Sequence, residues 1–432
     1  MAAEPPTILC AGDLHLGRHP TRIPAEHDGP SCSPKGVWRR VVDTAVKQDV
    51  TAVLLSGDII DQENRYFEAY GAFENGASRL DEAGIETLVV TGNHDAESLP
   101  DLVESLDIPH LRLLGKEQTW ERHTVTRDGE PLFHVDGWSF AQRHVLSSPL
   151  RDYDPEPAEE PVIGLLHADF DGRGSEYAPV QRSEFEATTV DTWVLGHIHA
   201  PGVQIDADPC VFYPGSLQPL DPGESGVHGA WTLRLDASGV TSPKQQPLAS
   251  VCYDTVEVDV SDIETATQAP ERIQTRVKAE LDGRDTSALD VFVARVHLTG
   301  RTESHGDLLQ RRVKMVEDLQ FRVETVPIVV EKLEVATEPD VDLSSLADGD
   351  SPVAYLAELL LTLEGGDETE SFSELRTAAL EATREVHTHG TYSPLHAAGR
   401  LEHPDESTAT AVLREQARVL LHELRSQEES IS

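Results

Sequence analysis

The sequence "VTAVLLSGDIID", residues 50–61, sets an apolar run directly against a Gly-Asp pair and a further aspartate, Asp61. A short run rich in valine and leucine has the composition of a strand buried on both faces. A surface turn would explain one Gly-Asp pair, since glycine accepts positive φ angles and aspartate is common in loops. Other strand-like runs of this chain end in the same way, so these polar strand ends need a common explanation.

Residues 7–138 alternate strand-like runs with helical stretches. The runs "TILCA" and "VTAVLL" flank "GVWRRVVDTAVKQ", whose apolar residues recur on one helical face, and a second helical stretch at about 63–83 precedes "ETLVV". Farther along, "VIGLLH" and "DTWVLG" repeat the buried-strand pattern. Strands joined through helices favour crossover connections and parallel pairing. The chain is therefore predicted to adopt an α/β fold.

The chain of 432 residues exceeds one ordinary hydrophobic core, so more than one domain is expected. We predict a first domain at 1–250 and an α+β domain at 251–338, in which strands and helices alternate and "FRVETVPIVVEKLEV" forms the last strand. A Ser/Asp/Gly-rich linker is predicted at 339–350. The remainder, 351–432, is predicted to be helical, with acidic amphipathic helices at about 351–364, 369–388 and 406–428.

The formal charge of −42 arises from 77 acidic residues against 35 basic ones, of which seven are lysine. Regular apolar runs indicate a folded chain rather than a disordered acidic polymer. We interpret the charge as a halophilic surface, adapted to high salt in which ions screen mutual repulsion. An acidic surface normally opposes nucleic-acid binding. In molar salt, however, the Debye length falls to about 3 Å. Net charge is then no evidence for or against nucleic-acid binding.

The four cysteines stand far apart and form no CxxC pair, which argues against a disulfide framework and against a zinc knuckle. The sequence has no basic segment followed by an apolar one at its start, and no apolar run long enough for a membrane span. We therefore expect a cytoplasmic protein without a signal peptide and without a membrane partner.

Five strand ends of the first domain deliver side chains that bind divalent metals. The motifs are "AGDLHLG", "SGDIID", "TGNHD", "LLHADF" and "LGHIH". The carboxyl ends of neighbouring strands form the ligand crevice of α/β sheets, so residues far apart in sequence are expected to converge there. Each motif alone is more often ordinary loop chemistry, but five in this order are not explained by coincidence. The candidate ligands are Asp13, His15, Asp58, Asn93, His167, His197 and His199.

These donors are oxygen and imidazole nitrogen atoms without a thiolate, which suits Mn²⁺, Fe²⁺, Mg²⁺ or Zn²⁺ rather than a structural zinc. Glycines at 12, 57, 92 and 196 directly precede ligand positions and would let the backbone approach the centre closely. His228, which follows the site-forming strands in "VHGAW", is expected to be a solvated histidine.

The ordered set resembles the calcineurin-like metallophosphoesterase superfamily, whose pattern is DxH, GDxxD, GNH(D/E), H and GHxH. The resemblance covers most of residues 7–235 and implies a β-sandwich flanked by helices. It implies two divalent metal ions, the first held by Asp13, His15 and His199 and the second by Asn93, His167 and His197, with Asp58 bridging them. It further implies that His94 protonates the leaving oxygen and that Asp95 orients His94. Two such cations, about 3.5–4 Å apart, position a phosphate and activate the attacking water.

Within the superfamily, "GDLHLGR" and the stretch from "DIIDQ" to "TGNHD" resemble the nuclease subunit of SbcCD-type DNA repair complexes, and the segment "DFDGRGSEYAPVQRSEF" to "LGHIHAP" resembles the YhaO-like exonuclease branch. This resemblance implies a DNA exonuclease or endonuclease, with Mn²⁺ as the expected metal and 251–338 as a DNA-capping domain. It implies an SMC-like coiled-coil ATPase partner docked on the C-terminal helices, and a homodimer formed near 63–83. Asp61 departs from the histidine that several archaeal members carry there, and at most orients a neighbour.

Two other functions stay open at this point. One is a small-molecule phosphodiesterase or phosphatase of the same superfamily, which needs a closed pocket rather than a groove. The other is an assembly scaffold for a DNA-bound ATPase, which missing ligands would favour, whereas here none is missing. The C-terminal helices likewise have an alternative role as a subdomain packed on their own chain.

Overall fold

The computed structural model describes residues 5–61, 66–236, 239–240, 242–340, 342–365, 370–388 and 404–431. The chain divides into two compact units. The first comprises residues 1–256, 274–296 and 316–333, and the second comprises 257–273, 297–315 and 334–432.

The first of two large sheets contains a parallel core, as the crossover pattern predicts. Its parallel strands are β1 (Thr7–Ala11), β2 (Ala52–Leu55), β3 (Glu86–Val89) and β4 (Leu111–Leu113), in that order. Antiparallel strands complete the edge beside β1: β13 (Gly229–Asp236), β14 (Gly239–Val240) and β15 (Lys244–Pro247). The crossover helices are α1 (Pro34–Lys47), α2 (Tyr66–Glu82) and α3 (Ser98–Leu106).

The second sheet has the order β11-β12-β10-β7-β6-β5. Its four central strands are parallel: β6 (Glu130–Trp138), β7 (Val162–His167), β10 (Thr192–Gly196) and β12 (Cys210–Tyr213). Antiparallel strands flank them: β5 (Glu121–Arg127) and β11 (Gly202–Ile205). Three short elements lie between β7 and β10: β8 (Asp169–Phe170), β9 (Pro179–Val180) and α4 (Arg182–Glu186).

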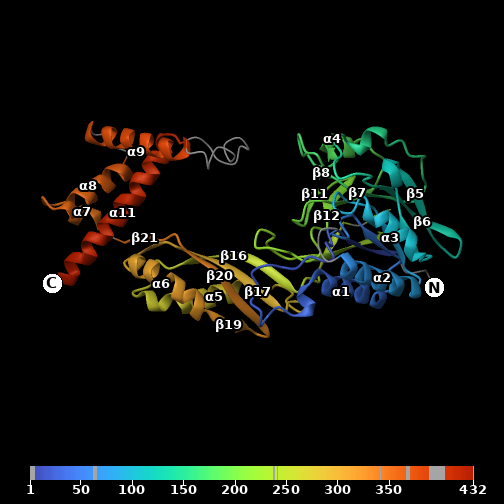
Figure 1. The fold of residues 1–432 in the computed structure, drawn as a ribbon, viewed down its shortest axis with the longest axis horizontal. Coiled ribbons are helices and arrows are strands. Elements are labelled where there is room, and N and C mark those ends of the chain that lie inside the picture. Colours follow the sequence, from blue (N-terminus) through green and yellow to red (C-terminus); the bar gives the residue numbers. More distant parts are fainter. Residues whose placement is uncertain are drawn as a thin grey trace. The chain divides into compact units, whose positions relative to one another are not determined.

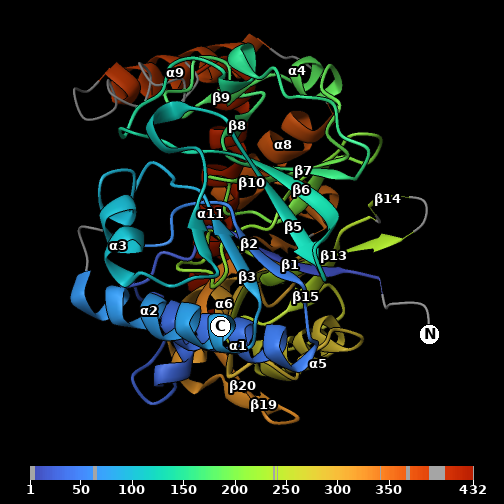
Figure 2. The same ribbon diagram turned by 90° about the vertical axis from the view of Figure 1, so that its right-hand side faces the viewer.

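Alternation along the strands builds a layered core, because successive side chains of a strand point to opposite faces. Ile8 and Cys10 of β1 join a buried cluster with Ile163 and Leu165 of β7, which fills the space between the two sheets. Leu9, between them in sequence, faces the other way and packs in a separate cluster with residues of α1 to α3. The result is the predicted β-sandwich flanked by helices (Figures 1 and 2).

Helices α1 and α2 pack side by side on this outer face (Figure 2). Trp38 of α1 is buried, and its indole N–H donates a hydrogen bond to the Ala72 carbonyl oxygen of α2 at 3.2 Å. The ring also lies against Gly76, where a Cβ atom would overlap the indole. The close approach of the two helices therefore depends on a residue without a side chain.

A third sheet follows, with the order β16-β17-β20-β19. Its elements are β16 (Val251–Asp259), α5 (Ala269–Leu281), β17 (Val291–Thr299), α6 (His305–Asp318), β19 (Gln320–Val323) and β20 (Val326–Val335). The prediction of one last strand in this region is wrong. Glu324 has a φ angle of 52°, which turns the chain so that Val323 pairs antiparallel with Val326. A further two-stranded ladder joins β18 (Arg301–Thr302) and β21 (Glu338–Pro339).

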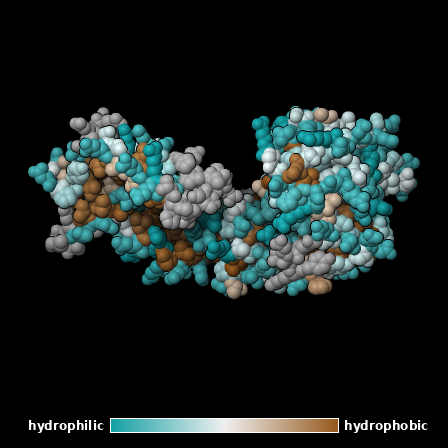
Figure 3. All heavy atoms as spheres, turned by 45° about the horizontal axis from the view of Figure 1, so that its top comes forward, coloured by the Kyte–Doolittle hydropathy of each residue, from teal (hydrophilic) through white to brown (hydrophobic). Residues whose placement is uncertain are grey.

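The three predicted C-terminal helices are present as α8 (Pro352–Gly365), α9 (Glu370–Thr388) and α11 (Glu406–Ile431). The segment 339–350, predicted as a linker, contains a helical turn, α7 (Leu343–Leu346), in which the Asp342 side chain accepts a hydrogen bond from the Ser345 amide at 3.1 Å. The leucines of α7 pack against a cluster that contains Leu359 and Leu360 of α8. Apolar residues appear as brown patches on the surface of the molecule (Figure 3). Among the exposed large hydrophobic side chains of α8 and α11 are Tyr355, Val412, Val419 and Leu420.

Two simpler expectations concern the whole chain. All four cysteines lie among the described residues and carry free thiols. Within the ranges that the structure describes, every helix is too short or too polar to cross a bilayer.

Replacing Gly76 with alanine is expected to destabilise the fold by about 1–3 kcal/mol, because the new methyl group overpacks against Trp38. Gly71→Ala is the matched control in the same helix. Nothing lies within 4 Å of its added Cβ, so the better helix former should stabilise the protein, by about 0.5–1 kcal/mol. Urea unfolding of both variants in concentrated KCl measures the two changes. Equal stabilisation by both substitutions would contradict this account of the α1–α2 contact.

Candidate metal centre

The structure brings the predicted ligands of both sheets together at the carboxyl ends of the parallel strands. Asp13 and His15 follow β1, Asp58 follows β2, Asn93 follows β3, His167 ends β7, and His197 and His199 follow β10. Backbone hydrogen bonds hold the first two loops in register: the Asp13 amide donates to Gly57 O at 3.1 Å, and the His15 amide donates to Asp58 O at 2.9 Å. The site is therefore fixed by the same strand ends that build the sandwich.

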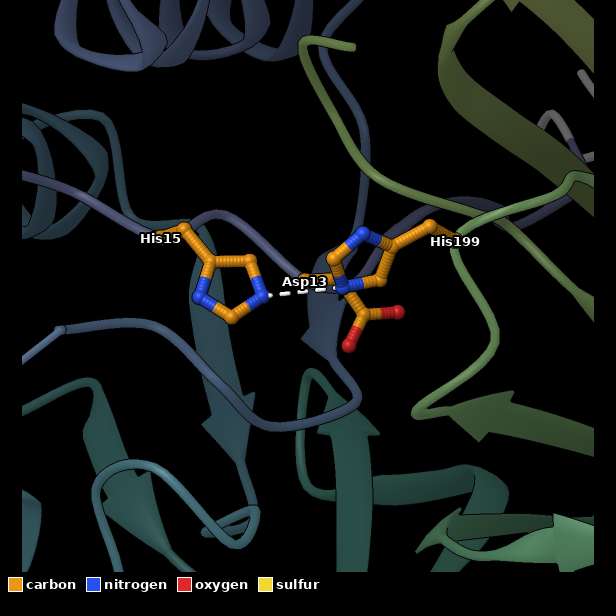
Figure 4. Close-up of side chains that lie close together, drawn as sticks. All are labelled: Asp13, His15 and His199. Atoms are coloured by element: carbon orange, nitrogen blue, oxygen red, sulfur yellow. Dashed lines mark hydrogen bonds between the residues drawn. The ribbon is translucent and has the colours of Figure 1, made fainter. Parts of the chain in front are cut away.

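Asp13, His15 and His199 form one group of donors. One ligand atom from each lies within 4.8 Å of the others. Figure 4 shows the two imidazole rings approaching from opposite sides beside the Asp13 carboxylate, with their Nε2 atoms 3.1 Å apart. The backbone amide of His197 donates to both carboxylate oxygens of Asp13, at 3.0 and 3.2 Å. This backbone contact joins the β1 loop to the β10 loop.

Asn93, His167 and His197 form a second group. Asn93 Oδ1 lies 3.0 Å from His167 Nε2 and 3.3 Å from His197 Nδ1. The Nδ1 atom of His167 lies 3.0 Å from the Ser56 carbonyl oxygen, to which it donates. This bond fixes the tautomer of His167 and leaves its Nε2 lone pair facing the centre.

Asp58 lies between the two groups. Its Oδ2 atom is 3.9 Å from His15 Nε2 and 3.5 Å from His167 Nε2, while Oδ1 accepts a hydrogen bond from the His94 amide at 2.9 Å. A carboxylate in this position can face two cations at once. The assignment of each residue to one of two ions remains a prediction.

Burial governs the charges of the centre. Asp13 is 1% and Asp58 is 2% exposed. Burial raises the pKa of Asp13, whereas for Asp58 the effect of burial is outweighed by His167 and His15, so that its pKa is lowered. Burial also lowers the pKa of His15 and of His197 to about 3, which keeps both rings neutral. Buried carboxylates beside imidazoles are a donor set that divalent cations use, so these residues fit a metal centre.

The backbone at several ligands is left-handed. The φ angles are 46° at Asp13, 45° at His15, 51° at Asp58 and 104° at His197. Such conformations of non-glycine residues are strained and concentrate at functional sites. Sharp turns, rather than extended i, i+2 spacing alone, therefore aim these side chains at a common point.

Glycine allows the backbone to approach the centre closely, as predicted. A Cβ atom at Gly196 would lie 2.6 Å from His167 Nδ1, and one at Gly92 would lie 2.7 Å from both Asp58 Cγ and His167 Cε1. Any side chain at these two positions would displace a candidate ligand.

His94 lies beside His15 at the centre. It is partly exposed, and its ring centroid lies 5.1 Å from that of His15 in an edge-on arrangement. The carboxylate of Asp95, predicted to orient His94, accepts hydrogen bonds from the backbone amides of Gly92 at 2.8 Å and Ile59 at 2.6 Å. Burial, followed by the charge of Asp58, raises the pKa of Asp95 to about 7. Through these contacts Asp95 positions the whole loop that carries His94.

Sequence reasoning missed Glu224. Its Oε1 accepts a hydrogen bond from His199 Nδ1 at 2.8 Å, and its Oε2 accepts from Ser216 Oγ at 2.7 Å and from the Leu220 amide at 3.1 Å. Burial alone would raise the pKa of Glu224, but the hydrogen bond and charge of His199 lower it to about 2. For His199, burial alone would lower the pKa, but Glu224 and Asp13 raise it to about 9. A carboxylate behind a ligand histidine fixes its ring and raises its basicity.

The prediction that His228 is solvated is wrong. The residue is 2% exposed, and its Nδ1 lies 2.8 Å from the Ser216 carbonyl oxygen. It directly precedes β13, which pairs with β1, so it is drawn into the interior behind the metal centre. Ser216 thus connects His228 to Glu224, the partner of His199.

Comparison with known proteins gives two family matches. Residues 6–201 match the family described as calcineurin-like phosphoesterase. Residues 253–338 match the family described as metallophosphoesterase YhaO, middle domain.

Three curated relatives illustrate the similarity. The uncharacterized metallophosphoesterase YhaO of Bacillus subtilis is 27% identical over 274 residues, which are 60% of this chain and 65% of that protein. The DNA double-strand break repair protein Mre11 of Aeropyrum pernix is 27% identical over 247 residues, 54% of this chain and 58% of that protein. The Mre11 protein of Haloferax volcanii is 26% identical over 290 residues, 64% of this chain and 59% of that protein. Each match spans less than two thirds of the relative.

Removing the Glu224 side chain is expected to weaken metal binding. Glu224→Ala should reduce the affinity for Mn²⁺ about 10–100-fold, because His199 loses the partner that fixes its ring. Glu224→Gln is the matched variant, since its amide oxygen can still accept from His199 Nδ1, and it should recover part of the loss. Titration calorimetry on chelator-treated protein measures all three affinities. Unchanged affinity in Glu224→Ala would show that Glu224 serves folding alone.

Metal binding should also become tighter as the pH rises toward about 9, the pKa to which Glu224 and Asp13 raise His199. Below that pH, His199 holds a proton that an incoming metal must displace. Calorimetry at pH 7 in buffers of different ionisation enthalpy counts the released protons. Wild type should release close to one proton from this residue, and Glu224→Ala should release less because its His199 is less basic. Equal release would contradict the coupling of Glu224 to His199.

Proposed function

Residues 6–201 form a calcineurin-like phosphoesterase domain, and from this premise we propose that the chain is a two-metal phosphodiesterase that hydrolyses DNA. The observation that carries the proposal is the convergence of seven oxygen and nitrogen donors from two sheets, beside a partly exposed histidine. The alternative of an inactive scaffold is disfavoured because every predicted ligand lies within this one cluster.

Two divalent cations, when bound, would supply the electrostatic stabilisation of the phosphate and the activated water. We propose Asp13, His15 and His199 as donors to one ion, Asn93, His167 and His197 as donors to the other, and Asp58 as the bridge. The mixed carboxylate and imidazole set suits Mn²⁺, with Fe²⁺, Mg²⁺ and Zn²⁺ as alternatives.

His94 is proposed as the proton donor to the leaving oxygen. Its exposed side can meet a substrate, while its backbone amide is held by Asp58 at 2.9 Å and its loop is held by Asp95. The imidazole would thus be positioned before substrate arrives, which is the condition for efficient general acid catalysis. Asp61 shares a cluster with His15 and His94, in which one ligand atom of each lies within 4.8 Å of the others. We propose that it helps to orient His94.

DNA is proposed as the substrate because two of the relatives described above carry the name of a DNA double-strand break repair protein. A small phosphodiester is the competing substrate of the same chemistry. The formal charge of −42 supports a halophilic protein, for which concentrated KCl is the appropriate assay medium.

Partners are proposed from exposed apolar side chains. On α8 and α11, Tyr355, Val412, Val419 and Leu420 are exposed, which supports docking of an SMC-like coiled-coil ATPase. On α2, Phe67 is 89% exposed, which supports the homodimer contact proposed for this helix. Residues 251–338 are proposed to cap the DNA.

The proposal is tested by His94→Asn, assayed on end-labelled duplex DNA and on a bis-nitrophenyl phosphodiester with Mn²⁺ in concentrated KCl. DNA hydrolysis should fall about 10²–10⁴-fold, because the sugar oxygen needs a proton to leave. The aryl ester should lose much less activity, since nitrophenolate leaves without protonation. Mn²⁺ content should match that of wild type.

Two outcomes would contradict this scheme. Equal loss on both substrates would remove His94 from the role of proton donor. Hydrolysis of the ester by wild type, with duplex DNA left intact and no stimulation by an added ATPase, would favour the small-substrate enzyme.

A further inference from the structure

A cavity lies between α1 and α2. Its volume is about 600 Å³, and its lining includes the loop from Gly17 to His19 and the facing sides of the two helices. This volume falls within the range of small-ligand sites. None of the predicted metal ligands lines it, so it is distinct from the centre itself.

The charge of this cavity is opposite to that of the chain. The sequence holds 77 acidic residues against 35 basic ones, yet the charged lining consists of Arg18, Lys35, Arg39 and Arg79 with Glu68 as the one carboxylate. Arg79 pairs with Asp43 at 2.7 Å. Lys35 and Arg39 form no ion pair within the described part of the chain. Both side chains are exposed, and together with Arg18 they give the cavity a basic lining that can meet an anion.

Three sequence features around the cavity reduce the stability of the helices that carry them. Lys35 stands in the first turn of α1, which holds no acidic residue, although the helix dipole disfavours cations there. Lys35 and Arg39 are like charges four residues apart on that helix. Gly71 stands inside α2 without a steric reason, because nothing lies within 4 Å of an added Cβ. Violations of local rules that share one place are expected at functional or strained sites.

The cavity is connected to the predicted chemistry. Arg18 Nε lies 3.5 Å from Asp61 Oδ2. Asp61 in turn belongs to the cluster with His15 and His94, whose ligand atoms lie within 4.8 Å of one another. Arg18, at one end of the basic lining, is therefore connected through its ion pair with Asp61 to His94, the proposed proton donor.

We propose that this cavity binds a backbone phosphate of the substrate strand, next to the phosphodiester that is cut. Guanidinium and ammonium groups are the side chains that recognise phosphate oxygens. The proposal rests on the proposed function and deepens it, since it makes the enzyme select a chain of phosphodiesters over an isolated one. Gly71 keeps the space open, and the unpaired cations of α1 face the strand.

The test places a carboxylate in the cavity with Gly71→Glu, beside Gly71→Gln of the same size and no charge. Val46→Glu is the matched control, because it adds the same charge to an exposed position of α1 outside the cavity. Binding of a fluorescein-labelled 20-base-pair duplex is measured by anisotropy with chelator present, so that no cutting occurs. Hydrolysis of the bis-nitrophenyl ester with Mn²⁺ is measured in parallel.

Gly71→Glu should weaken duplex binding about tenfold or more, Gly71→Gln less, and Val46→Glu hardly at all. The ratio of DNA hydrolysis to ester hydrolysis should fall in the same order. As a second line, Lys35→Gln combined with Arg39→Gln should reduce the slope of log affinity against log KCl by about one for each lost phosphate contact. Both results together would identify a phosphate contact rather than a change of fold.

Several outcomes would overturn the inference. Two of them are an unchanged duplex affinity in Gly71→Glu and an unchanged salt slope in the double variant. A third is a loss of ester turnover equal to the loss of DNA binding. A fourth is displacement of the duplex by inorganic phosphate at the same phosphate concentration. The last would assign the cavity to a free anion. A wild-type protein that binds duplex through this cavity, but does not cut it with Mn²⁺ even with an added ATPase, would instead refute the proposed nuclease and leave the phosphate contact standing.

Discussion

The arrangement of the metal centre and its loops depends on two buried carboxylates. Asp13 and Asp58 are almost fully removed from water, and an isolated buried carboxylate is too costly to maintain. Backbone amides from neighbouring loops and a ring of imidazoles compensate this cost in part, and divalent cations, when bound, would compensate the rest. Parallel pairing brings these side chains together, because the parallel strands of each sheet end at the same edge. The fold and the site are therefore consequences of the same topology.

Much of this was predictable because each ligand stands directly behind a buried strand. Val53 to Leu55, followed by Gly57 and Asp58, reveals both a strand and the direction in which it ends. His167 is identified in the same way, as the last residue of an apolar run. Patterns of this kind depend only on local sequence and on the general rule that strand ends converge.

Other features could not be predicted because they depend on contacts distant in sequence or on single backbone angles. Glu224 lies in a loop without periodicity, and only the fold brings it to His199, 25 residues away. His228 looks like a surface histidine until β13 pairs with β1. The hairpin between β19 and β20 depends on one left-handed residue, Glu324, within an otherwise continuous strand pattern. The alternation of apolar residues along the sequence predicts none of these three features.

The burial of most of the donor set separates two kinds of evolutionary change. His167 and Asp58 are shielded from solvent, so the charges that decorate the exterior act on them only through screened, long-range fields. A lineage can thus exchange lysine for glutamate over most of its exterior, following the salinity of its habitat, while the interior chemistry stays constant. Different residues of the same chain therefore determine its solubility and its reactivity.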